Sequence, residues 1–194
     1  MEDEDIVLLD QTGAAIGTAP KASSHHRETP YHLAFSSYVL DEAGRVLITQ
    51  RAHHKTTWPS VWTNTCCGHP APGERLRDAV LRRLRDELGI TAEGLTPLLP
   101  EFSYRAEMDN GVVEYERCPV VRAVFKGPDT GAVHPNPEEV AAARWLTWEE
   151  CLELAERPEA SPWYRLQLAQ LAPLGSPLDW PAASPALLPP ALAW

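Results

Sequence analysis

The sequence has no apolar run long enough to cross a bilayer and no excess of basic residues. Its 27 acidic residues outnumber 17 lysines and arginines, which leaves a net charge of −10 and a pI near 5.1. A nucleic-acid surface would need a basic excess, so a general polyanion binder is excluded. The first residues, MEDED, are acidic where a secretory signal would be basic. We therefore expect a soluble, cytoplasmic monomer that binds neither nucleic acid nor membranes.

Cysteine is also scarce, and the sequence shows no internal repeat. The chain has four thiols, Cys66, Cys67, Cys118 and Cys151. None of them has the C-x-x-C spacing of a zinc knuckle or a thioredoxin-like site, so we expect reduced thiols. A length of 194 residues with 44% hydrophobic content predicts one domain with a real core, which we place at residues 1–172. Six prolines interrupt residues 173–194 and predict a tail with little regular structure and partial disorder.

An aromatic, extended stretch turns into a charged helix between residues 58 and 90. Gly73 and Glu74 stand where the chain enters the helix, and Gly89 supplies a stop. Apolar residues recur at four-residue spacing along it: Leu76, Val80, Leu84 and Leu88. The sequence therefore predicts a helix that ends at residue 88, with one face packed and another free for chemistry.

The remaining elements are predicted from composition and turn residues. We expect strands at 6–9, 31–40, 45–51, 102–106, 112–125 and 143–146, hairpin turns at 41–44 and 109–111, a surface loop at 127–137, and helices at 147–155 and 163–171. Thr147 and Glu150 form a capping box at the start of the first of these helices. Pro119 should mark an edge or a bulge in its strand. This mixture of strands and helices predicts an α/β fold.

The central helix and the loop before it fit a known pattern. The Nudix signature, Gly-x5-Glu-x7-Arg-Glu-x-x-Glu-Glu-x-Gly, is matched by Gly68, Glu74, Arg82, Arg83, Asp86, Glu87 and Gly89. Arg83 and Asp86 depart from it, since Nudix hydrolases carry glutamates there that hold magnesium. The run TNTCCGHP at residues 63–70 resembles the active-site segment of the type I isopentenyl-diphosphate isomerases, a Nudix branch. This resemblance covers about residues 7–163 and implies an α/β/α sandwich with a mixed sheet and a loop-helix-loop catalytic segment.

The resemblance also implies a reaction, the interconversion of isopentenyl and dimethylallyl diphosphate through a tertiary carbocation in isoprenoid biosynthesis. Cys67 and Glu116 would handle protons on the two faces of the substrate, and Tyr104 would hydrogen-bond near Glu116. A nearby cation and a helix N-terminus would make the Cys67 thiol more acidic. Trp62 and Trp163 would face the carbocation in a pocket without water.

A metal site is implied as well. Glu114 and Glu116 lie two apart in a strand, so both carboxylates share one face and repel each other unless a cation or a proton lies between them. Without the pattern, the chain's histidines and glutamates would be ordinary surface residues. The resemblance assigns five ligands to one Mn²⁺, Mg²⁺ or Zn²⁺ ion: His25, His32, His69, Glu114 and Glu116. It assigns a second ion, Mg²⁺ bound with the diphosphate, to Glu87 and the Cys67 backbone. The donor types do not choose between the metals.

The diphosphate itself would be held by basic side chains, whose charge-assisted hydrogen bonds suit phosphate oxygens. The resemblance places four of them there: Lys21, Arg51, Lys55 and Arg83. Two other functions stay open. A Nudix hydrolase of nucleoside or prenyl diphosphates is disfavoured by Arg83 and Asp86. An inactive Nudix module that only binds a ligand or partner, with the Pro-rich tail as a docking segment, is disfavoured by Cys67 and Glu116.

Overall fold

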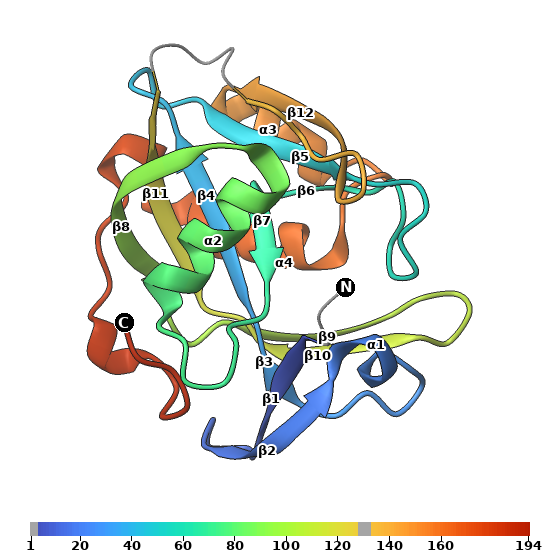
Figure 1. The fold of residues 1–194 in the computed structure, drawn as a ribbon. Helices are drawn as coiled ribbons and strands as arrows, with labels where there is room; N and C mark the ends of the chain where they lie inside the picture. The colour runs from blue at the N-terminus through green and yellow to red at the C-terminus, as the bar shows by residue number, and fades with distance from the viewer. Residues whose placement is uncertain (1–3, 128–132) are drawn as a thin grey trace.

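The computed structural model describes residues 4–127 and 133–194, and its strands form two mixed β-sheets (Figure 1). The first sheet contains, from edge to edge, β2 (Ala15–Pro20), β1 (Asp5–Leu9), β3 (His32–Leu33), β10 (Val113–Arg117) and β9 (Ser103–Glu107). The second contains β12 (Val140–Leu146), β5 (Val46–Arg51), β4 (Phe35–Leu40), β11 (Val120–Lys126) and β8 (Thr91–Leu99). Two short strands extend it, with β6 (Trp62–Thr63) paired to β5 and β7 (Cys66–Gly68) paired to β4.

Two segments cross from the first sheet to the second, side by side. The prediction of one strand at 31–40 and one at 112–125 is wrong, because each is divided between the two sheets: β3 continues as β4, and β10 continues as β11. β3 runs parallel to β10, and β4 runs parallel to β11. The Ser36 amide donates to the Pro119 carbonyl at the crossing. Pro119 has no N–H for a sheet ladder, which suits the break. The site described below lies at this junction.

Helix α2 (Leu76–Leu88) covers one face of the second sheet (Figure 1). Its apolar stripe and the strands below form one buried cluster, which includes Phe35, Val39, Leu47, Leu76, Val80, Leu84, Leu88, Val121 and Ala123. The helix ends at Gly89, whose φ of 64° is left-handed and costs glycine little. The predicted packing face and the predicted end of this helix are both confirmed.

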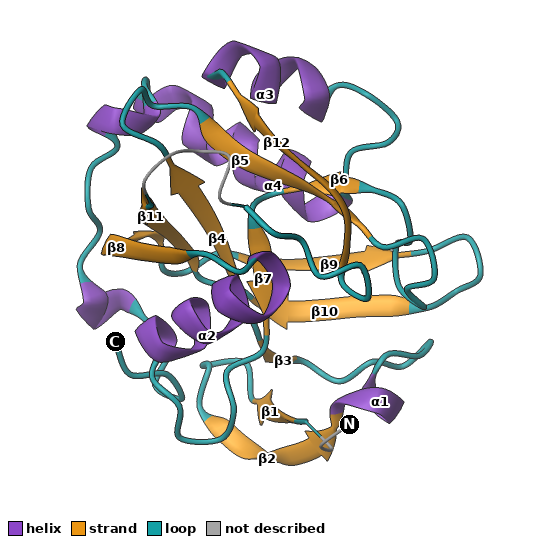
Figure 2. Ribbon diagram, turned by 45° about the horizontal axis from the view of Figure 1, so that its top comes forward, coloured by secondary structure: helices purple, strands orange, loops and turns teal. Residues whose placement is uncertain are grey.

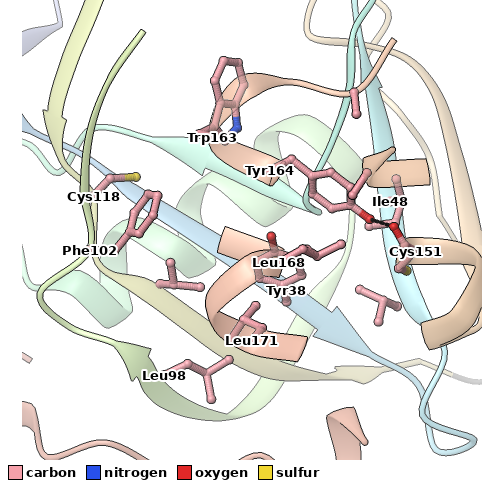
Figure 3. Packing of buried hydrophobic residues seen from close by; sticks show 14 of the residues in the cluster. Tyr38, Ile48, Leu98, Phe102, Cys118, Cys151, Trp163, Tyr164, Leu168 and Leu171 are labelled. Atoms are coloured by element: carbon pink, nitrogen blue, oxygen red, sulfur yellow. Dashed lines mark hydrogen bonds between the residues drawn. The ribbon is translucent and has the colours of Figure 1, made fainter. Parts of the chain in front are cut away.

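Helices α3 (Trp148–Ala155) and α4 (Pro162–Leu171) cover the opposite face. Because successive strand residues point to opposite sides, Tyr38 packs on this side while its neighbour Val39 faces α2. Figure 3 shows Tyr38 among Tyr164, Leu168 and Leu171 of α4. The predicted capping box of α3 is confirmed, since the Glu150 amide donates to the Thr147 hydroxyl and the Thr147 amide to the Glu150 carboxylate.

The C-terminal segment, residues 173–194, is packed against both cores. It contains only short 3₁₀ turns, in line with its proline content. Trp180 is 2% exposed and packs edge-to-face on Tyr38, while Leu192 is buried in the cluster under α2. This packing differs from the partial disorder that the prolines suggested, because the aromatic and aliphatic residues between them find buried sites.

Some elements have no counterpart in the prediction. Strands β2 and β8 and the one-turn helix α1 (Lys21–Ser24) were not expected. The loop predicted at 127–137 lies partly outside the described residues, at 128–132. In the described part of the chain, no helix is long and apolar enough to span a membrane.

Candidate active site

A cavity of about 860 Å³ opens where the two sheets meet. Its walls come from α1, the loop after β5, β7, α2, β9, β10 and the start of α4. Figure 2 shows β7, β9 and β10 converging beside α2. Most of the predicted site residues line it: Lys21, His25, Arg51, Lys55, Cys67, His69, Arg83, Glu87, Tyr104, Glu114, Glu116 and Trp163. Segments distant in the sequence therefore supply one site.

Four potential ligands converge at one end, with one donor atom of each lying within 4.8 Å of the others: His25, His32, His69 and Glu116. His32 lies opposite Glu116 in the β3–β10 pair, and its Nδ1 donates to the Pro30 carbonyl at 2.8 Å. That hydrogen bond leaves the Nε2 lone pair 3.4 Å from Oε1 of Glu116. His69 Nε2 is 3.3 Å from the same oxygen. Neither Nε2 has a hydrogen-bond partner among the described residues, although both are buried.

This arrangement fits a divalent cation. Buried imidazole lone pairs aimed at a carboxylate repel it unless a cation or a proton lies between them, and such nitrogen and oxygen donors suit Mn²⁺, Mg²⁺ or Zn²⁺. Burial opposes protonation of His32, but Glu116 raises the pKa of this ring, as expected of a site that draws positive charge. Burial lowers the pKa of His69 to about 3 and also lowers the pKa of His25, so both rings are neutral and free to ligate. Four of the five predicted ligands are thus brought together.

Glu114, the fifth predicted ligand, is not part of this cluster. Its Oε2 accepts a 2.8 Å hydrogen bond from the Tyr104 hydroxyl, which had been expected near Glu116. Burial and the nearby Glu116 charge raise the pKa of Glu114 to about 7. Burial also opposes ionisation of Glu116, but His32 and His69 hold its pKa well below the usual range. Two carboxylates on one strand face therefore favour different protonation states.

Cys67 lies on β7, in the wall that the second sheet supplies, whereas Glu116 lies on β10 of the first sheet. Its Sγ is 3.1 Å from the Asn64 amide oxygen and 3.4 Å from the Ser36 hydroxyl. Burial raises the pKa of the thiol to about 12. The groups that contact the sulfur are neutral, so nothing in direct contact offsets this effect of burial, and the greater acidity expected of the thiol depends on the nearby cation.

Lys21 and Lys55, two of the predicted diphosphate ligands, are paired with carboxylates in the wall. Lys21 Nζ lies 2.6 Å from Glu4, and Lys55 Nζ lies 2.5 Å from Glu139. Neither glutamate was predicted for the site, since isolated acidic residues in the sequence give no signal. A diphosphate would have to compete with these carboxylates for the two lysines.

Trp163 forms the aromatic wall of the cavity; it is 2% exposed, and its ring lies tilted by 36° against that of Tyr104, with the ring centroids 5.9 Å apart. The Arg51 guanidinium lies 5.8 Å from the Trp163 ring centroid. Trp62 does not line the cavity, contrary to the prediction. Its neighbour Thr63 on β6 lines the cavity instead. Because adjacent strand residues face opposite ways, Trp62 points away from the cavity. The Arg144 guanidinium lies over the Trp62 ring, 4.8 Å from the ring centroid.

Comparison with known proteins decides the family. A family model described as the NUDIX domain matches residues 30–167. The chain belongs to the Nudix family. The Nudix chain is 53% identical to the isopentenyl-diphosphate Delta-isomerase of Saccharopolyspora erythraea, over 97% of this chain and 96% of the relative. It is 48% identical to the protein of the same name from Rhizobium rhizogenes, over 97% and 90%.

Solved structures agree on the Nudix fold. A Deinococcus radiodurans protein superposes with a TM-score of 0.63 at 18% identity, over 84% of this chain and 96% of that one. A MutT NUDIX hydrolase from Burkholderia pseudomallei gives 0.55 at 23% identity, over 73% and 98%. The predicted α/β fold of Nudix type is confirmed.

The two departures from the Nudix signature lie in different places. Asp86 is exposed, whereas Arg83 lines the cavity and donates to Glu87 from Nη2 at 2.6 Å and from Nε at 2.9 Å. Burial disfavours the charged guanidinium, but the carboxylates of Glu87 and Glu139 raise its pKa. The cation thus stands among carboxylates on the helix face where Nudix hydrolases carry another acid.

Two further signature residues hold the loop to the helix. Arg82 Nε and Nη2 donate to the two Glu74 oxygens, each at 2.8 Å, and Nη2 also reaches the His69 carbonyl at 3.3 Å. The Ala71 amide donates to Glu74 as well. This pair of side chains therefore fixes the backbone beside His69, which is a structural role.

Proposed function

We propose that this chain interconverts isopentenyl and dimethylallyl diphosphate by moving a double bond, a reaction of isoprenoid biosynthesis. Relatives about half identical over nearly the whole chain carry the name of that enzyme. The observation that carries the proposal is the cavity, which combines a buried thiol, a carboxylate among imidazoles, an aromatic ring and several cations. A diphosphate ester with a short apolar chain fits this combination of walls.

The reaction adds one proton and removes another. A proton added at C4 of isopentenyl diphosphate leaves a tertiary cation at C3, and loss of a proton from C2 then gives dimethylallyl diphosphate. Cys67 and Glu116 lie in walls contributed by different sheets and serve as the two proton-carrying groups. Since the reaction is reversible, the group that donates in one direction accepts in the other. Tyr104 takes part through Glu114, because its hydroxyl donates to that carboxylate, which lies on the same strand face as Glu116.

The cation at C3 needs a surface that stabilises it and does not react. The Trp163 ring offers a π-face, and attraction between a cation and an indole is worth about 2 kcal/mol or more when water is excluded. Lys21, Arg51, Lys55 and Arg83 hold the diphosphate at the polar end. Exclusion of water matters because water would capture the carbocation.

Divalent ions complete the proposal. His25, His32, His69 and Glu116 would hold one Mn²⁺, Mg²⁺ or Zn²⁺ ion. Glu114, whose carboxylate accepts a hydrogen bond from Tyr104 in this structure, would turn to the ion as the fifth ligand. When bound, that ion offsets the charge of the buried carboxylates. Glu87 and the Cys67 backbone hold a Mg²⁺ ion that binds with the diphosphate. The position of Glu87 in the cavity wall, where Arg83 pairs with it, supports this proposal.

Further properties belong to the same proposal. Residues 1–172 form the catalytic unit, which acts as a monomer without nucleic acid, as the acidic charge favours. A mechanism that needs a free thiol suits a reducing compartment, which supports the cytoplasm as the place of action.

The test is to incubate the purified protein with isopentenyl diphosphate and Mg²⁺ and to separate the products. We expect dimethylallyl diphosphate from the wild type and no turnover from Cys67→Ala or Glu116→Gln. Cys151→Ala removes a buried thiol that does not line the cavity and serves as the matched control, with normal turnover. Recovery of unreacted substrate from the wild type would refute the proposal, and release of phosphate would favour a hydrolase.

A further inference from the structure

The side chain of Asn64 is buried, with 0% exposure, and its orientation is determined by its partners. Its amide nitrogen donates to the carbonyls of Ser37 at 3.1 Å and Cys66 at 2.8 Å. Its oxygen accepts from the indole Nε1–H of Trp163 at 3.2 Å. Carbonyls only accept and an indole only donates, so exchanging the two ends of the amide would break all three hydrogen bonds.

This orientation decides what the amide offers to Cys67. The oxygen of Asn64 lies 3.1 Å from the Cys67 sulfur, so the thiol S–H donates and Asn64 accepts. The Thr63 hydroxyl donates to the same oxygen at 2.8 Å. Ser36 contacts the sulfur as well, at 3.4 Å. One oxygen thus joins the thiol and the indole, which both line the cavity, although Asn64 itself does not line it.

We propose that Asn64 is a positioning residue of the isomerase site, whose amide oxygen holds the Cys67 thiol and the Trp163 indole in fixed relation to each other. This inference rests on the proposed function. Proton transfer at one carbon and cation stabilisation at the next require the sulfur and the ring face to be placed together. A misplacement of about 1 Å can cost about 100-fold in rate. Asn64 acts through these two side chains, because it does not touch the cavity.

The test compares Asn64→Leu with Thr65→Val. Leucine has a similar volume but cannot accept a hydrogen bond. Thr65 is the next residue and equally buried. Its hydroxyl donates to the Leu47 carbonyl at 2.5 Å and accepts from the Val39 amide at 2.8 Å, and it has no hydrogen bond to the thiol or the indole. Both variants lose stability, which urea unfolding measures. We expect only Asn64→Leu to lower kcat, by roughly 10- to 100-fold with little change in KM.

A second measurement follows the indole directly. The Trp163 indole resonance is assigned in ¹H–¹⁵N spectra by its loss in Trp163→Phe, and in the wild type it should exchange slowly with solvent. The indole N–H resonance of Trp163 should move upfield in Asn64→Leu, and its chemical shift should be unchanged in Thr65→Val. Normal kcat in Asn64→Leu, or fast exchange of this proton in the wild type, would overturn the inference. The resonance does not depend on turnover, so a wild type that is inactive would refute the proposed function and leave this inference testable.

Discussion

Binding of a divalent ion should stabilise this protein strongly, because the folded site holds ligand atoms that lack partners. The Nε2 atoms of His32 and His69 and the Nδ1 of His69 are buried without hydrogen bonds among the described residues. Each such group costs about 1–3 kcal/mol when left unsatisfied. A cation that binds only the folded state and is present at 100 times its Kd adds about 2.7 kcal/mol. For a chain of this length that corresponds to a rise in Tm of about 5–11 °C.

The assay is thermal unfolding after treatment with a chelator, followed by addition of Mn²⁺, Zn²⁺ or Mg²⁺ in separate samples. His69→Gln removes one ligand and should reduce the rise, whereas His53→Gln changes an exposed histidine outside the site and should leave it intact. Elemental analysis of the protein as purified identifies the ion. The reasoning fails if none of the three ions raises Tm by more than about 1 °C at saturation, or if His69→Gln responds like the wild type.

Three further predictions concern other parts of the chain. The Arg82 hydrogen bonds lower the pKa of Glu74 from its ordinary value of 4.5. The ionised Glu74 side chain therefore stabilises the fold above pH 4.5, and this stabilisation is lost as the pH falls through the lowered pKa. The difference in unfolding free energy between wild type and Glu74→Gln should accordingly narrow on acidification. Trp180→Ala should cost about 3–5 kcal/mol in urea unfolding, and a cost below about 0.5 kcal/mol would indicate a disordered tail. Glu4→Gln should lower KM for the diphosphate several-fold by freeing Lys21, with kcat unchanged.

The parts of the fold that the sequence predicted are those that local patterns determine. The four-residue spacing before Gly89 and the capping box at Thr147 depend on neighbours in sequence, and both are present. Strand β8 was missed because Gly94 and Pro97 lie within it, and both residues disfavour strands. The crossing between sheets at residue 34 was missed because the segment is apolar on both sides of it, so no local signal marks the change of sheet.

The site shows the same limit. The motif around Cys67 predicted which residues would gather at the cavity, but not how buried or how oriented they would be. The motif gives no sign of the burial that raises the pKa of the Cys67 thiol, because segments distant in the sequence produce that burial. Trp62 and Thr63 are adjacent in a strand, so their side chains point to opposite faces, but the sequence does not show which of the two faces the cavity. Asn64 stood in the quoted motif, yet its role appears only when Trp163, 99 residues later, is in place.

The double crossing between the sheets explains why a proton-transfer site can be built here. Because β3 runs parallel to β10, and their continuations β4 and β11 run parallel to each other in the second sheet, the junction brings groups from both sheets to one cavity. Glu116 comes from one sheet and Cys67 from the other, so in the proposed reaction a flat substrate between them would meet one group on each face. In the same fold, Arg83 places a cation where hydrolases carry an acid that holds metal. In the proposed reaction, the loss of a carboxylate would weaken activation of water, while the added charge would strengthen retention of the diphosphate. The diphosphate would therefore stay intact while hydrogen moves along the carbon chain.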